Sequence, residues 1–187
     1  MESTIKRLIG EVRKGDQEAF AEIVELYKDK VYQICYRMLG NVHEAQDVAQ
    51  EAFLRAYTNI DRYDINRKFS TWLFRIATNV SIDRLRKKKP DFHLQDEVKG
   101  TDGVTFESQL AADEELPEDQ VVTRELQDWV QNEINQLPIK YRTAIILKYI
   151  EDLSINEISE ILDMPPATVK TRVHRGREAL RKRMRHM

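Results

Sequence analysis

The sequence lacks the residues from which most metal and redox sites are built. It has one cysteine, Cys35, so no disulfide can form within the chain, and its four histidines show no zinc-ligand spacing. The stretch from His43 through Glu44 to Asp47 lacks the second histidine of a metalloprotease helix. No glycine-rich phosphate loop and no pairing of a nucleophile with a base is present. We therefore expect no metal, no cofactor and no enzymatic activity, and we expect Cys35 to be an ordinary core residue.

Long apolar runs are also missing, which argues against a signal peptide and against a helix that spans or inserts into a membrane. The 187 residues include only six glycines and five prolines, and apolar residues recur at steps of three and four. These features predict an all-α protein of one domain or two small ones. We expect it to be cytoplasmic.

Charge is unevenly distributed along the chain, although the net charge is only −2. Positions 67–89 hold eight basic residues and one acid, Asp83, whereas positions 91–122 hold ten acids and one base, Lys99. The C-terminus is basic again. The near-neutral total therefore hides two basic segments, where a polyanion such as nucleic acid would bind.

Helix-breaking residues and changes in composition divide the chain into three predicted parts: a helical unit over 1–89, a linker over 90–116 and a second helical unit over 117–187. In the first unit, Asp16 and Asn41 are expected to cap helices, Gly40 to end one, and the polar stretch 61–68 to form a turn before the last helix. The linker is acidic and has few periodic apolar residues, so we expect it to be mostly irregular.

The last 35 residues show the pattern of a helix-turn-helix. Ser154 to Glu157 is a capping box, and Asp163 can take the left-handed conformation at the turn before Pro165 and Pro166. The second helix carries one acid, Glu178, and eight basic residues: Lys170, Arg172, Arg175, Arg177, Arg181, Lys182, Arg183 and Arg185. Such a helix suits the major groove of DNA. The alternative is a solvated basic helix at a C-terminus.

Four segments together resemble the extracytoplasmic-function group of bacterial sigma factors. NVHEAQDVAQEAFLRAY at 41–57 resembles region 2.2, FSTWLFRIATNVSIDRLRK at 69–87 resembles regions 2.3 and 2.4, and LPIKY at 137–141 with residues 152–179 resembles region 4. The resemblance implies a sigma factor that directs core RNA polymerase to promoters, in response to cell-envelope stress. It implies sigma region 2 at 1–89 and sigma region 4 at 117–187.

The resemblance also implies the partners of the chain. They are core RNA polymerase, through the clamp helices of its β′ subunit and through its β subunit, promoter DNA, and a membrane-bound anti-sigma factor. Asp47, Gln50 and Glu51 would dock the polymerase. From the residues alone, an ordinary solvated helix face is the alternative.

For the −10 element, the resemblance points to the turn 61–68 and the helix after it. Basic side chains would follow the phosphates of opened DNA, and aromatic or amide side chains would engage unpaired bases. Tyr63, Asn66 and Lys68 are the stronger candidates because they lie in the turn, whereas Trp72 and Phe74 fit a core better. The full candidate set is Tyr63, Asn66, Arg67, Lys68, Phe69, Trp72, Arg75, Asn79 and Arg84.

For the −35 element, four positions of the last helix match the positions with which the family reads bases, and two more fit phosphate contacts. The base-reading set is Lys170, Thr171, His174 and Arg175, and the phosphate-contacting pair is Arg172 and Arg177.

Two other functions remain open. A stand-alone helix-turn-helix regulator would explain the C-terminal unit but not the aromatic and basic stretch at 67–89. An RNA-binding or adaptor protein would explain the basic segments but would have no use for a major-groove helix.

Overall fold

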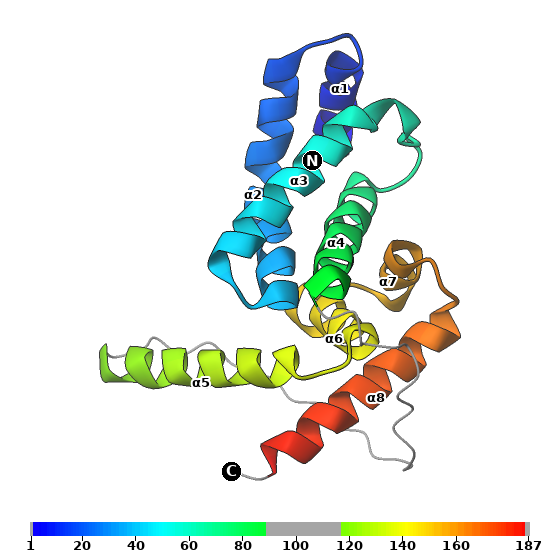
Figure 1. The fold of residues 1–187 in the computed structure, drawn as a ribbon. Coiled ribbons are helices and arrows are strands. Elements are labelled where there is room, and N and C mark those ends of the chain that lie inside the picture. The colour runs from blue at the N-terminus through cyan, green and yellow to red at the C-terminus, as the bar shows by residue number, and fades with distance from the viewer. Residues whose placement is uncertain (1, 89–116, 186–187) are drawn as a thin grey trace.

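The computed structural model describes residues 2–88 and 117–185, and it contains only helices and turns there (Figure 1). The first unit comprises α1 Glu2–Val12, α2 Gln17–Leu39, α3 Val42–Thr58, the short 3-10 helix η1 Ile60–Arg62 and α4 Phe69–Lys88. The second comprises α5 Pro117–Asn135, α6 Ile139–Ile145, the π-helical turn η2 Ile146–Ile150, α7 Ile155–Leu162 and α8 Pro166–Met184. The all-α prediction is confirmed for these ranges. The expected linker at 90–116 lies outside the described residues.

Short-range signals place the helix ends of the first unit where the sequence predicted them. The Asp16 carboxylate accepts hydrogen bonds from the amides of Glu18 and Ala19, and the Asn41 side chain accepts one from the amide of Glu44. Gly40 ends α2 with φ of 67°, a left-handed conformation that glycine adopts without strain. These caps fix both ends of α2 and the start of α3.

The core of the first unit lies among α2, α3 and α4, and α1 packs on α2. Ile34, Ala52 and Leu73 are fully buried there. Cys35 is buried as predicted, and burial raises the pKa of its thiol to about 11. The thiol is therefore neutral at physiological pH and acts as an apolar side chain.

The helix-turn-helix in the second unit is confirmed. The Ser154 hydroxyl accepts from the Glu157 amide while the Glu157 carboxylate accepts from the Ser154 amide, and Asp163 adopts a φ of 53° at the turn. Further along α8, Gly176 faces α6, where an added Cβ would lie 2.7 Å from Cγ1 of Ile145. The absence of a side chain therefore lets α8 approach α6 closely.

The two units pack on each other. Helix α7 lies against α4, and α2 contacts α5 and η2 (Figure 1). The buried apolar cluster runs without a break from Leu8 and Leu73 in the first unit to Ile146 and Ile158 in the second. The sequence predicted a core for each unit. It did not predict that the cores would be continuous, because nothing in the local pattern indicates which helix faces which.

Arg142 joins the two units from a buried position. Its side chain is 7% exposed, and its guanidinium donates to the carbonyls of Met38 at the end of α2 (2.8 Å), Leu137 (3.2 Å) and Asn135 at the end of α5. Burial lowers the pKa of Arg142 to about 10, so it still carries a charge at neutral pH. A cation at two helix C-termini is also favoured by the helix dipoles.

None of the described helices combines the length and the apolar character that crossing a lipid bilayer requires.

Candidate nucleic-acid and polymerase interfaces

The outer face of α3 carries the three residues expected to dock the polymerase. Asp47 and Gln50 are exposed, and Leu54 on the same face is 66% exposed. Glu51 is half-buried, because its carboxylate lies 2.5 Å from Nη2 of Arg55 and 4.0 Å from Nη2 of Arg84. The face therefore combines an acid, an amide and an apolar side chain that the sequence analysis did not single out.

The turn before α4 is held by an aromatic cluster and by an arginine that follows α1. Tyr63 packs its ring against Phe69 and Trp72, with ring centroids 5.3 Å and 5.1 Å away. The Arg13 guanidinium donates to the Tyr63 carbonyl at 2.5 Å and to the Ile60 carbonyl at 3.1 Å. The backbone of the turn is thus fixed to the first unit at both ends.

The burial of the aromatic −10 candidates differs from what the sequence predicted. Tyr63 is only 4% exposed, and its hydroxyl donates to the Arg67 carbonyl. Phe69 is also buried, whereas Trp72 is half-buried. Phe74 belongs to the core, as expected. Tyr63 is therefore not an open platform for a base, but its ring can still form the wall of a cavity.

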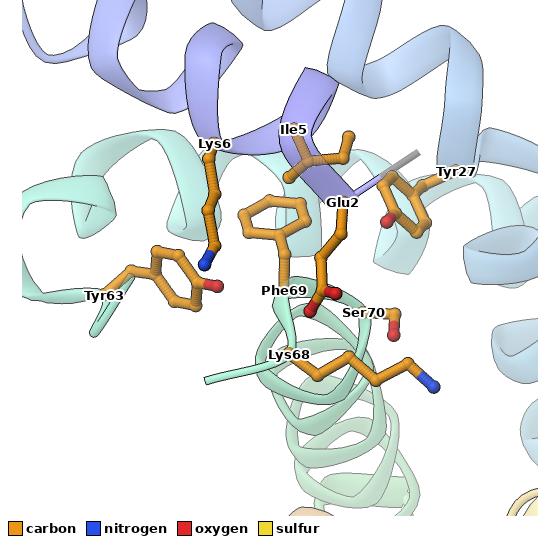
Figure 2. Close-up of a pocket in the computed structure, with 8 residues that line it drawn as sticks. All are labelled: Glu2, Ile5, Lys6, Tyr27, Tyr63, Lys68, Phe69 and Ser70. Carbon is orange, nitrogen blue, oxygen red and sulfur yellow. The ribbon is translucent and has the colours of Figure 1, made fainter. Parts of the chain in front are cut away.

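A cavity of about 270 Å³ lies beside these rings (Figure 2). Its walls are apolar side chains from α1, α2 and the turn, and polar side chains gather around them. The lining residues are Glu2, Ile5, Lys6, Tyr27, Tyr63, Lys68, Phe69 and Ser70. Burial raises the pKa of Tyr27 and of Tyr63, so both phenols are neutral. The α1 and α2 members were not predicted from the sequence, because they lie far from the turn along the chain.

Two basic residues expected at the −10 element contact the helix-turn-helix. The Lys68 ammonium lies 2.5 Å from the Glu157 carboxylate, and Arg75 lies 3.3 Å from the Asp163 carboxylate. The hydrogen bond between Lys68 and Glu157 raises the pKa of Lys68 and lowers that of Glu157, so both stay charged near neutral pH. The sequence indicated Glu157 and Asp163 only as a cap and a turn residue.

Of the other −10 candidates, Arg67 lies beside this contact, because it lines one pocket together with Arg75 and Asp163. Asn66, Arg67 and Asn79 are exposed. The Arg67 guanidinium is 3.8 Å from the Asp64 carboxylate. Arg84 faces α3 rather than α7, as its contact with Glu51 shows. The structure thus does not bring the nine residues together on one surface, because Arg84 lies on another side of α4.

The expected −35 residues fall into two groups on α8. Lys170, Thr171 and Arg175 are exposed, whereas Arg172, His174 and Arg177 are half-buried. The Thr171 hydroxyl donates to the Ala167 carbonyl at 3.1 Å, within its own helix. Burial lowers the pKa of Arg172, which lies near Tyr141. Lys170 and Arg175 are therefore the side chains best placed to reach a DNA groove.

Two family models match separate segments of the chain. Family models for Sigma-70 region 2 and Sigma-70, region 4 match residues 23–90 and 127–180. The first match begins within α2 and continues through α4, and the second includes α7 and most of α8.

Individual relatives agree with the family models. The chain is 66% identical over 187 residues to the ECF RNA polymerase sigma factor SigW of Bacillus subtilis (strain 168), with 100% of both chains covered. It is 36% identical over 176 residues to the ECF RNA polymerase sigma-E factor of Escherichia coli (strain K12), covering 92% of this chain and 90% of that protein.

Solved structures show the same fold at lower sequence identity. CnrH in complex with the cytosolic domain of CnrY has a TM-score of 0.71 at 22% identity, covering 98% of each chain. The sigma factor RpoE in complex with the anti-sigma factor NepR from Bartonella quintana has a TM-score of 0.64 at 22% identity, covering 89% of this chain and 96% of that one. With both sigma regions matched and a relative 66% identical over its full length, the chain belongs to the extracytoplasmic-function sigma factors of the sigma-70 family.

Proposed function

We propose that the chain directs core RNA polymerase to promoters through three separate surfaces. The exposed face of α3 binds the clamp helices of the polymerase β′ subunit, the turn and the start of α4 bind the opened −10 element, and α8 reads the −35 element in the major groove. The observation that carries the proposal is the aromatic cavity with a lysine at its edge, on the same chain as a basic recognition helix. A duplex-binding regulator would have no use for such a cavity.

The cavity has the chemistry that an unpaired base requires. A base leaves the stack only when the duplex is opened, and it is then held between aromatic or apolar side chains and read on its edge. Ile5, Tyr27 and Phe69 supply the apolar contact. Lys68 at the edge supplies a cation for the adjacent phosphate, in a contact that carries no sequence information.

The function is tested by adding the purified chain to core polymerase on a library of promoter templates. We expect transcripts that begin at defined positions and depend on both upstream elements. A helix-turn-helix regulator would instead shift duplex DNA without polymerase and would start no transcripts. An RNA-binding or adaptor protein would do neither.

Replacing Lys170 or Arg175 with alanine is expected to weaken transcription only from templates with the preferred −35 sequence. Each side chain is exposed on α8, and a good base-edge contact is worth about 1–3 kcal/mol of discrimination. Transcription is measured on templates with altered −35 bases, with Lys182→Ala as the control because Lys182 is exposed near the end of the same helix. Equal losses on every template would exclude base reading by Lys170 and Arg175.

The packed arrangement of the two units cannot serve both promoter elements at once. The elements lie about one and a half turns of DNA apart. Since each turn is ~34 Å long, their separation is on the order of 50 Å. In contrast, α7 rests directly on α4, with Lys68 and Arg75 bound to acids of the helix-turn-helix. We infer that the units separate when the polymerase and promoter are bound.

Removing the two acids should therefore ease DNA binding. Glu157→Gln keeps the capping box and Asp163→Asn keeps a residue that tolerates the left-handed conformation, so the double variant removes charge and preserves the helix-turn-helix. Exposed ion pairs are worth only about 0–1 kcal/mol each, so we expect binding of single-stranded −10 DNA to improve about threefold at low salt. The control is Glu125→Gln with Asp128→Asn. Both positions are exposed on α5, and the double variant makes the same change in net charge. Equal improvement in both double variants would mean that net charge alone is responsible.

We further propose a cytoplasmic location, a response to envelope stress and control by a membrane-bound anti-sigma factor. These proposals rest on the family. Among proteins of this fold, RpoE of Bartonella quintana has been solved with the anti-sigma factor NepR.

A further inference from the structure

The first turns of α1 form one side of the aromatic cavity. Glu2, Ile5 and Lys6 lie three and four positions apart, so they share one face of the helix. Ile5 is buried and holds this face against the rest of the unit. Figure 2 shows the Glu2 carboxylate near Phe69 and Ser70, with the ring of Tyr63 on one side of it and the ring of Tyr27 on the other, and all five residues line the cavity.

A carboxylate is an unusual group for a cavity that takes part of a polyanion. It would repel a phosphate, and an ionised carboxylate can only accept hydrogen bonds. The neighbouring cations Lys6 and Lys68 can take the phosphates instead. Toward a bound nucleotide, a carboxylate at this position is therefore useful only if it faces a donor on the base itself.

The four DNA bases differ in the donors that they present. Adenine, cytosine and guanine each carry an exocyclic amino group, whereas thymine has none, and its single ring donor, N3–H, lies between two carbonyl oxygens. A carboxylate facing the edge of an unstacked base gains a charge-assisted hydrogen bond from an amino group. When the base is thymine, the carboxylate can accept only from N3–H, and the carbonyl oxygens on both sides of that donor repel it, so the gain is smaller.

We propose that Glu2 selects the base that enters the aromatic cavity by accepting a hydrogen bond from an exocyclic amino group, so that thymine is disfavoured at that position of the −10 element. This inference rests on the proposed function, since it requires that an opened −10 strand reaches the cavity. It assigns a specificity role to α1, which lies outside the matched region 2 segment.

The test uses full-length chain assembled with core polymerase and a template library randomised across the −10 element. With the wild-type chain, we expect one position at which thymine is depleted about tenfold among transcribed templates, which corresponds to about 1.4 kcal/mol. Glu2→Gln should bring thymine at that position to within about twofold of the other bases, because an amide can donate to a thymine carbonyl. Preferences at the other positions should not change.

Glu22→Gln is the matched control, since Glu22 is exposed on α2 and does not line the cavity. Repeating the measurement on templates whose −10 region is already unpaired separates base selection from strand opening. A thermal melt shows whether Glu2→Gln folds normally, since loss of an acid from the first turn costs at most a small amount of stability.

Two results would overturn the inference: no thymine-depleted position with the wild-type chain, or the same depletion with Glu2→Gln. If Glu2 served only to stabilise the start of α1, the variant would lower the melting temperature and leave base preference unchanged. Failure of the wild-type chain to start any promoter-directed transcripts would instead remove the proposed function.

Discussion

Asp47→Arg is expected to abolish capture of core RNA polymerase while leaving the fold intact. Asp47 is exposed on α3, beside Gln50 and the exposed Leu54, so charge reversal there meets the partner and not the core. Like charges brought together in an interface cost several kcal/mol, and about 3 kcal/mol corresponds to a loss of affinity of roughly 100-fold. An exposed helix position should tolerate arginine within about 0.5 kcal/mol of stability.

Titration of labelled chain with core polymerase measures this loss, and a thermal melt checks the fold. Glu22→Arg is the control, because it makes the same charge reversal at an exposed position of α2 and should bind normally. Glu51 is a less clear site for reversal, because its carboxylate lies near Arg55 and Arg84 and an arginine there would disturb both. Normal capture by Asp47→Arg would place the polymerase interface elsewhere.

Arg142→Ala is expected to destabilise both helical units together. The variant leaves buried carbonyls of Met38, Leu137 and Asn135 without their donor. Breaking a buried charged network costs about 3 kcal/mol or more. For a chain of this size, that lowers the melting temperature by roughly 6–12 °C.

The two tryptophans allow each unit to be followed separately. Trp72 lies in α4 of the first unit and Trp129 in α5 of the second, so the single-tryptophan variants Trp129→Phe and Trp72→Phe report on one unit each. In both backgrounds, Arg142→Ala should lower the melting midpoint by the same amount. Arg183→Ala is the control, because Arg183 is exposed and its contacts with Glu133 and Gln136 lie within the second unit. A change seen by Trp129 alone would contradict the joining role of Arg142.

The elements predicted correctly are those determined by residues close together in the sequence. Asp16 and Asn41 cap their helices through amides two or three positions away, and Ser154 and Glu157 cap each other. Asp163 turns the chain by its own backbone conformation. Each signal spans less than one helical turn, so the sequence contains all of it.

The features that were missed depend on residues far apart. Lys68 and Glu157 are 89 positions apart, and Met38 and Arg142 are 104 apart. The cavity also joins α1 to the turn before α4. Hydrophobic periodicity shows that a helix has a buried face, but it does not show which helix covers that face. Tyr63 is close to Phe69 and Trp72 in the sequence, but the packing of their rings depends on the path of the turn, which helical periodicity does not predict.

The packing of α7 on α4 has a consequence for dilute protein. Because both helices belong to one chain, with 28 residues between Lys88 and Pro117, their encounter is intramolecular. Two parts of one chain meet at an effective concentration on the order of millimolar. This concentration does not fall when the protein is diluted, so ion pairs of modest strength can keep Lys68 and Arg75 occupied at any protein level. DNA and polymerase must therefore compete with the helix-turn-helix of the same chain, which does not diffuse away. The two units separate only when DNA and polymerase bind both of them at once.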